Sequence, residues 1–218
     1  MTLTIVTLGL MVDEAGGRRG RKNAQTRAAL AETALRLFLE KGYDAVSVKE
    51  IADAVDVSVP TVFNHVPDGK EALMFDDGTE RLENVLAAVR ERADGQSVMD
   101  ALREFIAGRG PFVADSSPEF RRRTDLIMTT PALRGYTRKL WIRCEEPLAA
   151  VIATEMGMRP DDLTARAVAR YVLEIPQFVG DAANPLDALH AVFDLLEHGL
   201  TKAVSIRNRP APDATKSS

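Results

Sequence analysis

The sequence predicts an all-α fold, with a small N-terminal helical domain followed by a larger helical one. Capping residues (Ser, Thr, Asp or Asn), often followed by proline, recur along the chain, and each precedes an amphipathic stretch. No strand-like alternation is bounded by hairpin signals, and the sequence has no internal repeat. We therefore expect nine helices and no strand.

The first three helices are closely spaced, within an N-terminal domain over residues 22–69. The first has apolar residues at helical spacing and ends at Gly42. Ser47 and Glu50 form a capping box before the second helix, and Ser58 caps the third. The three predicted helices are Ala28–Lys41, Lys49–Val55 and Val59–Val66.

Six further helices are expected in the larger domain, over residues 70–208. Most begin at a capping residue and end near glycine or proline. Pro147 and Pro176 lie inside two of these helices, and an internal proline predicts a kink. The predicted bounds, approximate at their ends, are 70–92, 97–106, 117 to before 130, 130–157, 161–179 and 185–206.

The composition is that of a globular protein with an uneven charge distribution. The 218 residues are 45% hydrophobic and 28% charged, so the chain can bury a real core. The formal net charge is −4, but a basic run precedes the first helix without any acidic residue inside it. Such a local run matters more for phosphate contact than the net charge does. The run contains Arg18, Arg19, Arg21, Lys22 and Arg27.

The apolar N-terminal stretch is not typical of a signal peptide, because it lacks a basic start and is followed by Asp13 and Glu14. It is also much shorter than the roughly 20 residues of a membrane span. Cys144 is the single cysteine, so neither an intramolecular disulfide nor a multi-cysteine metal site can form. We expect a cytoplasmic protein without a membrane partner, with a flexible basic leader over 1–21 and a flexible tail over 209–218.

The second and third helices have the spacing of a helix-turn-helix. If their apolar residues pack on the first helix, the third helix turns small and hydrogen-bonding side chains outward. Side chains of this kind can approach base edges in the major groove. Three core helices with an ordinary solvated face would give the same spacing. The outward residues are Pro60, Thr61, Asn64 and His65.

Three stretches of the N-terminal domain form an ordered pattern: Leu37–Tyr43 (LFLEKGY), Val46–Ala52 (VSVKEIA) and Val57–His65 (VSVPTVFNH). On these stretches, the segment from Thr26 to Leu73 resembles the TetR family. The resemblance implies a three-helix DNA-binding domain, a helical C-terminal domain that binds a small inducer, and a homodimer. It places Thr61, Asn64 and His65 at bases or adjacent phosphates. The residues that it places at or near the phosphate backbone are Thr26, Ser47, Phe63 and Lys70.

Four positions depart from the usual family pattern. Asp56 stands where glycine is usual in the turn, and aspartate tolerates the left-handed conformation better than most residues. Pro60 replaces a small residue and removes an N–H. Phe63 replaces tyrosine and therefore lacks a hydroxyl for phosphate, and the link before Lys70 is one residue longer than usual.

The basic arm, Gly17 to Lys22, can reach the minor groove or the phosphates, as the arms of some helix-turn-helix proteins do. A solvated tail is the alternative. Together with the helix residues, the candidate DNA contacts are Arg18, Arg19, Arg21, Lys22, Thr26, Ser47, Ser58, Pro60, Thr61, Phe63, Asn64, His65 and Lys70.

The larger domain has no recognisable catalytic set, so we expect neither an enzyme nor a bound cofactor. His190, Asp194 and His198 share one helix face, but a single helix rarely completes the coordination sphere of a metal ion. Large apolar side chains can line an inducer pocket or simply form core. The pocket candidates are Phe105, Phe112, Phe120, Met128, Trp141 and Phe178.

The last two helices are the expected dimer interface. Their apolar faces are broad, and two helices from each subunit would form a four-helix interface. An intrachain core is the alternative. The residues of these faces are Ala165, Val168, Ala169, Val172, Leu173, Leu189, Val192, Phe193, Leu195, Leu196 and Leu200.

These expectations describe a sequence-specific regulator, a repressor that a small-molecule inducer releases from a palindromic double-stranded DNA operator. The alternative is a helical small-molecule-binding or interaction protein with weakened DNA binding. Phe63 and the longer link before Lys70 give that alternative slight support.

Overall fold

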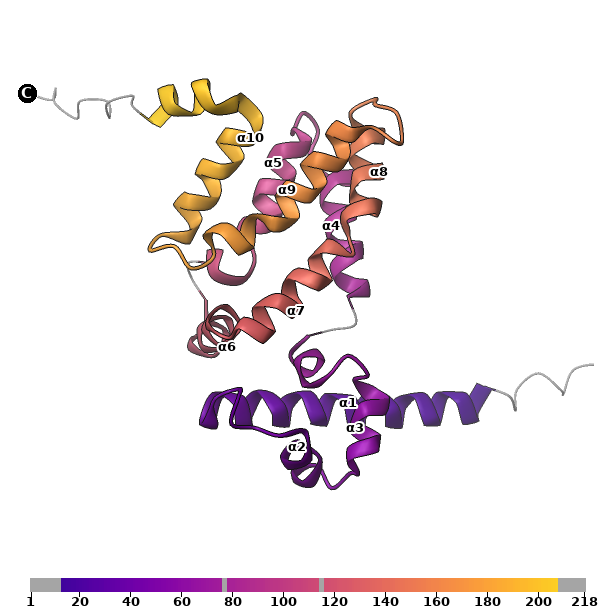
Figure 1. Cartoon of the computed structure of the whole chain (residues 1–218). Coiled ribbons are helices and arrows are strands. Elements are labelled where there is room, and N and C mark those ends of the chain that lie inside the picture. Colours follow the sequence, from indigo (N-terminus) through magenta and orange to yellow (C-terminus); the bar gives the residue numbers. More distant parts are fainter. Residues whose placement is uncertain (1–12, 76–77, 114–115, 208–218) are drawn as a thin grey trace, which may run out of the picture. The chain divides into compact units, whose positions relative to one another are not determined.

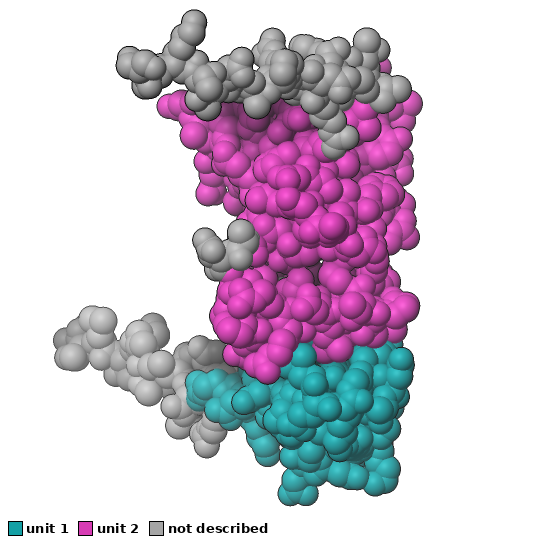
Figure 2. Space-filling view, turned by 90° about the vertical axis from the view of Figure 1, so that its left-hand side faces the viewer, with its two compact units in different colours: residues 1–76 teal, residues 77–218 magenta. Residues whose placement is uncertain are grey.

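The computed structural model describes residues 13–75, 78–113 and 116–207, and for 13–19 and 200–207 it describes only the helical backbone. Within these ranges the chain forms ten α-helices, two 3₁₀ helices and no strand (Figure 1). The all-α fold class is confirmed, with one α-helix more than expected. The chain divides into two compact units, residues 1–76 and 77–218 (Figure 2).

Unit 1 carries the predicted three-helix arrangement. Its two central caps are confirmed, because the Ser47 hydroxyl accepts a hydrogen bond from the Glu50 N–H at 3.1 Å and the Ser58 hydroxyl accepts one from the Thr61 N–H at 3.3 Å. Each bond satisfies a donor that a helix start leaves unpaired. The elements are α1 (Asp13–Lys41), α2 (Val48–Ala54), α3 (Val59–His65) and the 3₁₀ helix η1 (Lys70–Met74).

Helix α1 begins at Asp13, well before the predicted start at Ala28. Residues 13–21 are therefore helical, where we expected a flexible leader. The segment contains three glycines, which have poor helix propensity. The residue pattern therefore does not predict a helix here. The rest of the expected leader, and the expected tail over 209–218, lie outside the described residues.

The described part of unit 2 contains seven α-helices and one 3₁₀ helix. The hydroxyls of Ser97 and Ser117 and the carboxylate of Asp162 accept backbone N–H groups at three of the helix starts. No helix in the described ranges is long and apolar enough to cross a membrane. The elements are α4 (Thr79–Arg90), α5 (Val98–Ala107), η2 (Gly110–Phe112), α6 (Pro118–Thr129), α7 (Pro131–Ile142), α8 (Glu145–Glu155), α9 (Leu163–Val179) and α10 (Pro185–Arg207).

Two of the predicted long helices are not continuous, so these two predictions are wrong. The helix expected over 70–92 is divided into η1 and α4, which starts after Gly78 with its left-handed φ of 89°. The helix expected over 130–157 breaks between α7 and α8, before Pro147 rather than at it. Pro147 instead lies in the first turn of α8, where its missing N–H removes no helical hydrogen bond.

The other internal proline, Pro176, lies inside α9 as expected. Helix α10 is interrupted at Gly199, whose φ of 71° and ψ of 168° are not helical. Glycine takes such a conformation without the steric penalty of a side chain.

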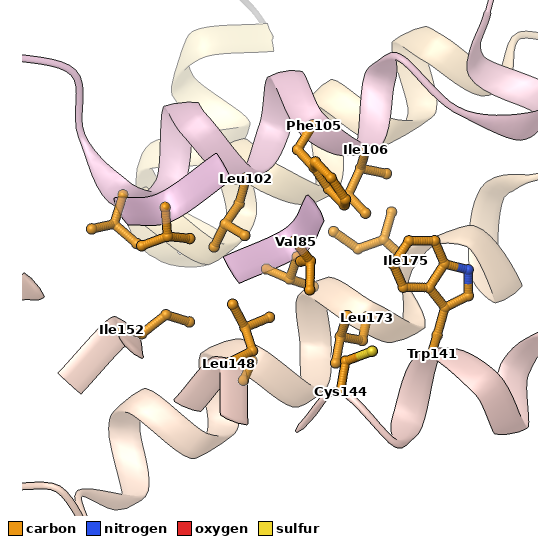
Figure 3. Packing of buried hydrophobic residues seen from close by; sticks show 14 of the residues in the cluster. Val85, Leu102, Phe105, Ile106, Trp141, Cys144, Leu148, Ile152, Leu173 and Ile175 are labelled. Atoms are coloured by element: carbon orange, nitrogen blue, oxygen red, sulfur yellow. The ribbon is translucent and has the colours of Figure 1, made fainter. Parts of the chain in front are cut away.

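The core of unit 2 is a single hydrophobic cluster to which most of its helices contribute (Figure 3). Val85 of α4, Leu102 of α5 and Leu148 of α8 are fully buried in it. Cys144 is also buried here, as a small apolar side chain. Helices α8 and α9 pack along one another, so the second half of the chain is held together by apolar burial.

Candidate nucleic-acid interface

The turn between α2 and α3 is tight and closed by backbone hydrogen bonds. Asp56 has a φ of 56°, the one positive φ among the non-glycine residues described. This confirms the left-handed conformation expected at the position where aspartate replaces glycine. The Val57 N–H donates to the carbonyl oxygen of Ala52 at 3.0 Å and fixes the exit from α2.

The inner face of α3 is fixed by burial. Val62 and Val66 are almost completely excluded from solvent, as are Ile51 and Ala52 of α2 and Phe38 of α1. Because α3 is only seven residues long, these two valines determine which way it is rotated.

The outward face of α3 has a polar centre with two different edges. At about 3.6 residues per turn, Asn64 lies opposite the buried valines. Pro60 and Phe63 adjoin it on one side, and both are exposed along with Asn64. Thr61 and His65 lie on the other side and are half-buried. The structure thus places the predicted base-facing residues together on one surface.

Arg27 of α1 forms a hydrogen bond with the C-terminal end of α3. Its Nη1 donates to the carbonyl oxygen of His65 at 2.8 Å, and its Nη2 donates to that of Phe75 at 3.2 Å. The guanidinium therefore faces inward, although the sequence groups Arg27 with the basic run. Its acceptors lie 38 and 48 residues away, so no local signal could have identified this role.

Lys70 is engaged in a similar way. Its ammonium donates to the carbonyl oxygens of Tyr43 and Val46, each at 2.8 Å, and lies 4.0 Å from the centroid of the Tyr43 ring. These contacts hold the loop between α1 and α2. The predicted phosphate contact of Lys70 would require the ammonium to leave both carbonyls.

The Tyr43 hydroxyl donates to the carboxylate of Glu71, the residue after Lys70. Burial, followed by this hydrogen bond, raises the pKa of Tyr43 far above its usual range. Tyr43 therefore stays protonated and keeps η1 attached to the loop that precedes α2.

The remaining candidate DNA contacts lie at the surface of unit 1 or outside the described side chains. Thr26 is half-buried, and its hydroxyl donates to the carbonyl oxygen of Lys22 at 3.0 Å. Arg18 and Arg19 belong to α1, but their side chains lie outside the described residues. The exposed candidates are Arg21, Lys22, Ser47 and Ser58.

The six residues proposed for an inducer pocket do not come together. Phe105, Phe112 and Trp141 are buried in the unit 2 core, and the rings of Phe105 and Trp141 meet edge to face at 6.2 Å (Figure 3). Phe120 and Phe178 are exposed, so aromatic character alone does not separate pocket from surface. Met128 is half-buried.

An open pocket of about 690 Å³ lies elsewhere in unit 2, where the start of α8 faces the loop before α9. None of the six candidates lines it. Its walls are strongly charged, which a search for aromatic side chains could not reveal. The lining residues are Ile142, Arg143, Glu145, Glu146, Ala149, Ala150, Pro160, Asp161, Asp162, Leu163 and Arg166.

An ion-pair network joins α7, α8 and α9 beside this pocket. Glu145 accepts from Arg170 at 2.6 Å and from Arg166 at 3.2 Å, and the hydrogen bond from Arg170 is the main reason why its pKa is lowered. The buried carboxylate of Glu174 accepts from Nε of Arg138 at 2.7 Å and pairs with Arg170 at 3.3 Å.

The predicted dimer residues of α9 lie on its inner face. Ala165, Ala169, Val172 and Leu173 are buried inside unit 2, so the intrachain alternative describes them correctly. A different side of α9 is exposed, and it carries large apolar side chains at helical spacing. These are Leu163, Tyr171 and Phe178, which are 78%, 55% and 63% exposed. On α10, Leu189 and Phe193 are likewise buried, whereas Leu195 is 41% exposed.

Two family models match the chain. The model described as "Bacterial regulatory proteins, tetR family" matches residues 30–76, which include the helix-turn-helix. The model described as "MftR C-terminal domain" matches residues 96–201, which make up most of unit 2. Both units thus have a family counterpart.

Individual proteins agree with these matches. MftR of Mycobacterium tuberculosis, named as a transcriptional regulator of mycofactocin biosynthesis, is 26% identical over 191 residues, which are 85% of this chain and 96% of that protein. TcmR of Streptomyces glaucescens, an HTH-type transcriptional regulator, is 31% identical over 152 residues, 67% of each chain.

Among solved structures, FadR of Thermus thermophilus in complex with lauroyl-CoA is similar, with a TM-score of 0.53 and 23% identity. The match covers 86% of this chain and all of that one. At this identity the likeness shows a common fold.

Proposed function

The chain belongs to the TetR family of bacterial transcriptional regulators, and we propose that it acts as a homodimeric repressor that a small molecule releases from its operator. The observation that carries the proposal is the outward face of α3, where Thr61, Asn64 and His65 follow a turn closed by backbone hydrogen bonds. A recognition helix of this kind enters the major groove and presents its outward side chains to base edges. Regulators of this family are not enzymes.

In this proposal Asn64 and its polar neighbours contact bases, while residues around them contact phosphates. The exposed hydroxyls of Ser47 and Ser58 and the exposed cations of Arg21 and Lys22 can make such contacts. Phosphate contacts position the protein on the duplex, and base contacts select the sequence. The repressor would act in the cytoplasm, where bacterial DNA lies.

The dimer is proposed to form through the exposed faces of α9 and α10. Tyr171 and Phe178 are more than half exposed in the single chain, and exposed apolar patches of this kind mark interaction sites. A two-fold dimer makes an isologous interface, in which the same patch of each subunit faces the other. It also predicts a palindromic operator with half-sites one helical turn, or a multiple of it, apart.

The inducer is proposed to bind unit 2 and to favour a dimer whose recognition helices are wrongly spaced. A ligand shifts such an equilibrium only by its difference in affinity for the two states. The lauroyl-CoA held by Thermus thermophilus FadR supports a ligand site in a chain of this fold. Phe105, Phe112 and Trp141 remain candidates for its apolar wall, since they meet in one cluster.

A gel mobility-shift titration tests the repressor proposal. Full-length protein is mixed at low salt with DNA from upstream of its own gene and with fragments covering the genome. The proposal predicts a specific shift that competitor DNA of random sequence does not remove. The absence of a shift with every fragment would contradict it.

A second candidate function is a helical ligand-binding protein with weakened DNA affinity. The observation in its favour is that Lys70 is held by two carbonyls, while Phe63 offers no hydroxyl to a phosphate. The same titration distinguishes the two, because only the second candidate lacks a specific shift.

A further inference from the structure

One edge of the outward face of α3 is apolar. Pro60 and Phe63, which we call the apolar edge, are three residues apart and therefore neighbours on the helix surface. Phe63 is 45% exposed although it lies in the middle of the helix that faces DNA. The opposite edge, with Thr61 and His65, is polar.

The direction in which Phe63 projects is set by the rotation of α3 about its own axis, which neighbouring residues fix. Val62 and Val66 are buried on the inner face, so turning Phe63 inward would expose a valine. The Ser58 cap holds the start of α3, and the bond from Arg27 to the carbonyl of His65 holds its end. Phe63 therefore projects on the same side of the helix as Asn64.

A phenyl ring at this place cannot replace the phosphate contact of a tyrosine, because it has no hydroxyl to donate. It can make apolar contact, and the apolar group that a base presents in the major groove is the 5-methyl of thymine. Asparagine, in turn, binds the N6 and N7 edge of adenine with two hydrogen bonds. An A·T pair displays both of these features in the same groove.

We propose that the apolar edge reads a thymine 5-methyl group in each operator half-site, next to an adenine bound by Asn64. The inference rests on the proposed DNA binding and makes it more specific. Phe63 becomes a specificity-determining residue instead of a backbone contact. The same chemistry predicts that the half-site contains A·T pairs at adjacent positions.

The test begins with operator DNA selected from random-sequence duplexes by the full-length protein. Each thymine of a half-site is then replaced by deoxyuridine, which removes only the 5-methyl group. For wild-type protein, we expect that replacing one particular thymine of the half-site lowers the affinity about fourfold. A loss of this size corresponds to the burial of one methyl group. In Phe63→Ala the same replacement should change affinity less than about twofold, because the partner of the methyl is gone.

Phe63→Tyr is the matched control, since it keeps the ring and should keep the loss caused by deoxyuridine. The melting temperature of each variant shows whether unit 1 remains folded, which is expected because the side chain is exposed. The inference is overturned if deoxyuridine has no effect at any position, or the same effect in Phe63→Ala. A failure to select any DNA overturns the proposed function as well, so the two failures are distinguishable.

Discussion

At the scale of single residues, the cationic side chains of unit 1 differ in what they face, and some pair with carboxylates, as Lys41 does with Glu50. Arg27 and Lys70 bind carbonyl oxygens within the unit, whereas Arg21 and Lys22 are exposed. The inward cations, Arg27 and Lys70, hold α3 and the loop before α2 in place. The exposed cations, Arg21 and Lys22, are available for phosphate contacts. Positive charge near a helix-turn-helix therefore does not by itself identify a DNA contact.

Replacing Lys70 tests this division. Lys70→Met removes two charge-assisted hydrogen bonds, so unit 1 should lose about 2 kcal/mol of stability in urea unfolding. Its DNA affinity should fall without a change in the salt slope. Lys22→Met is the control, and it should reduce that slope by about one while leaving stability unchanged. A slope reduced by Lys70→Met would show that the ammonium contacts phosphate instead.

Asp56 gives a second prediction at this scale. Asp56→Gly should be neutral or stabilising by up to about 1 kcal/mol, because glycine takes the left-handed conformation at no steric cost. Asp53→Gly, three residues earlier but inside α2, should instead destabilise the unit, since it weakens a helix and removes the ion pair with Lys49. Chemical unfolding of both variants provides the comparison. Equal losses would contradict the role given to the turn.

The caps at Ser47 and Ser58 and the turn at Asp56 could be predicted from the sequence, because every partner lies within a few residues. The partners of Lys70 are 24 and 27 residues away and are backbone atoms, which carry no side-chain signature. Its inward role was therefore not predictable from the local pattern.

At the scale of elements, the sequence predicts the helix starts that have a side-chain cap better than the uncapped starts and the breaks. A capping side chain lies within three residues of its partner, as at Ser97 and Ser117. The starts of α4 and α8 have no such cap and were not predicted. The break between α7 and α8 has no glycine, and the nearby Pro147 suggested a kink at the wrong residue. Helix α8 packs along α9 beyond this break, and local propensity does not record such tertiary packing.

The contact between α8 and α9 should depend on pH. The pKa of Glu145 is lowered in the folded chain by Arg170 and Arg166, so its contribution to stability is present above the ordinary glutamate pKa of about 4.3 and is lost as pH falls through the lowered value. Glu145→Gln should therefore flatten the acid side of the profile of unfolding free energy against pH. Glu146→Gln, at the exposed neighbouring position, is the control. An unchanged profile in Glu145→Gln would rule out this contribution.

At the scale of the whole molecule, the sequence locates the core helices and the helix-turn-helix but not the exposed apolar face of α9 that is proposed for the dimer. An apolar stripe such as Ala165, Ala169 and Val172 marks a buried face, and burial within one chain gives the same pattern as burial between two. On the exposed side of α9 the apolar residues, such as Tyr171 and Phe178, lie further apart in the sequence than those of the buried side, and polar residues lie between them. This exposed stripe can therefore be recognised only once the buried side of α9 is known.

Assembly provides the prediction at this scale. Tyr171→Glu combined with Phe178→Glu places charges on the exposed face of α9 and should convert the proposed dimer to a monomer in sedimentation equilibrium. The helix content should stay the same, because neither side chain belongs to the core. Phe120→Glu, at an exposed phenylalanine of α6, should leave the dimer intact. A dimer that survives the double substitution would place the interface elsewhere.

The most direct test of the central claim, that the outward face of α3 reads DNA, is a fluorescence anisotropy titration of Asn64→Ala. Asn64 is exposed at the centre of that face and supports no part of the core. Affinity for the selected operator should fall by at least about fivefold, the lower limit for a bidentate base contact, while affinity for random-sequence DNA stays the same. Unchanged affinity for the operator would contradict the claim.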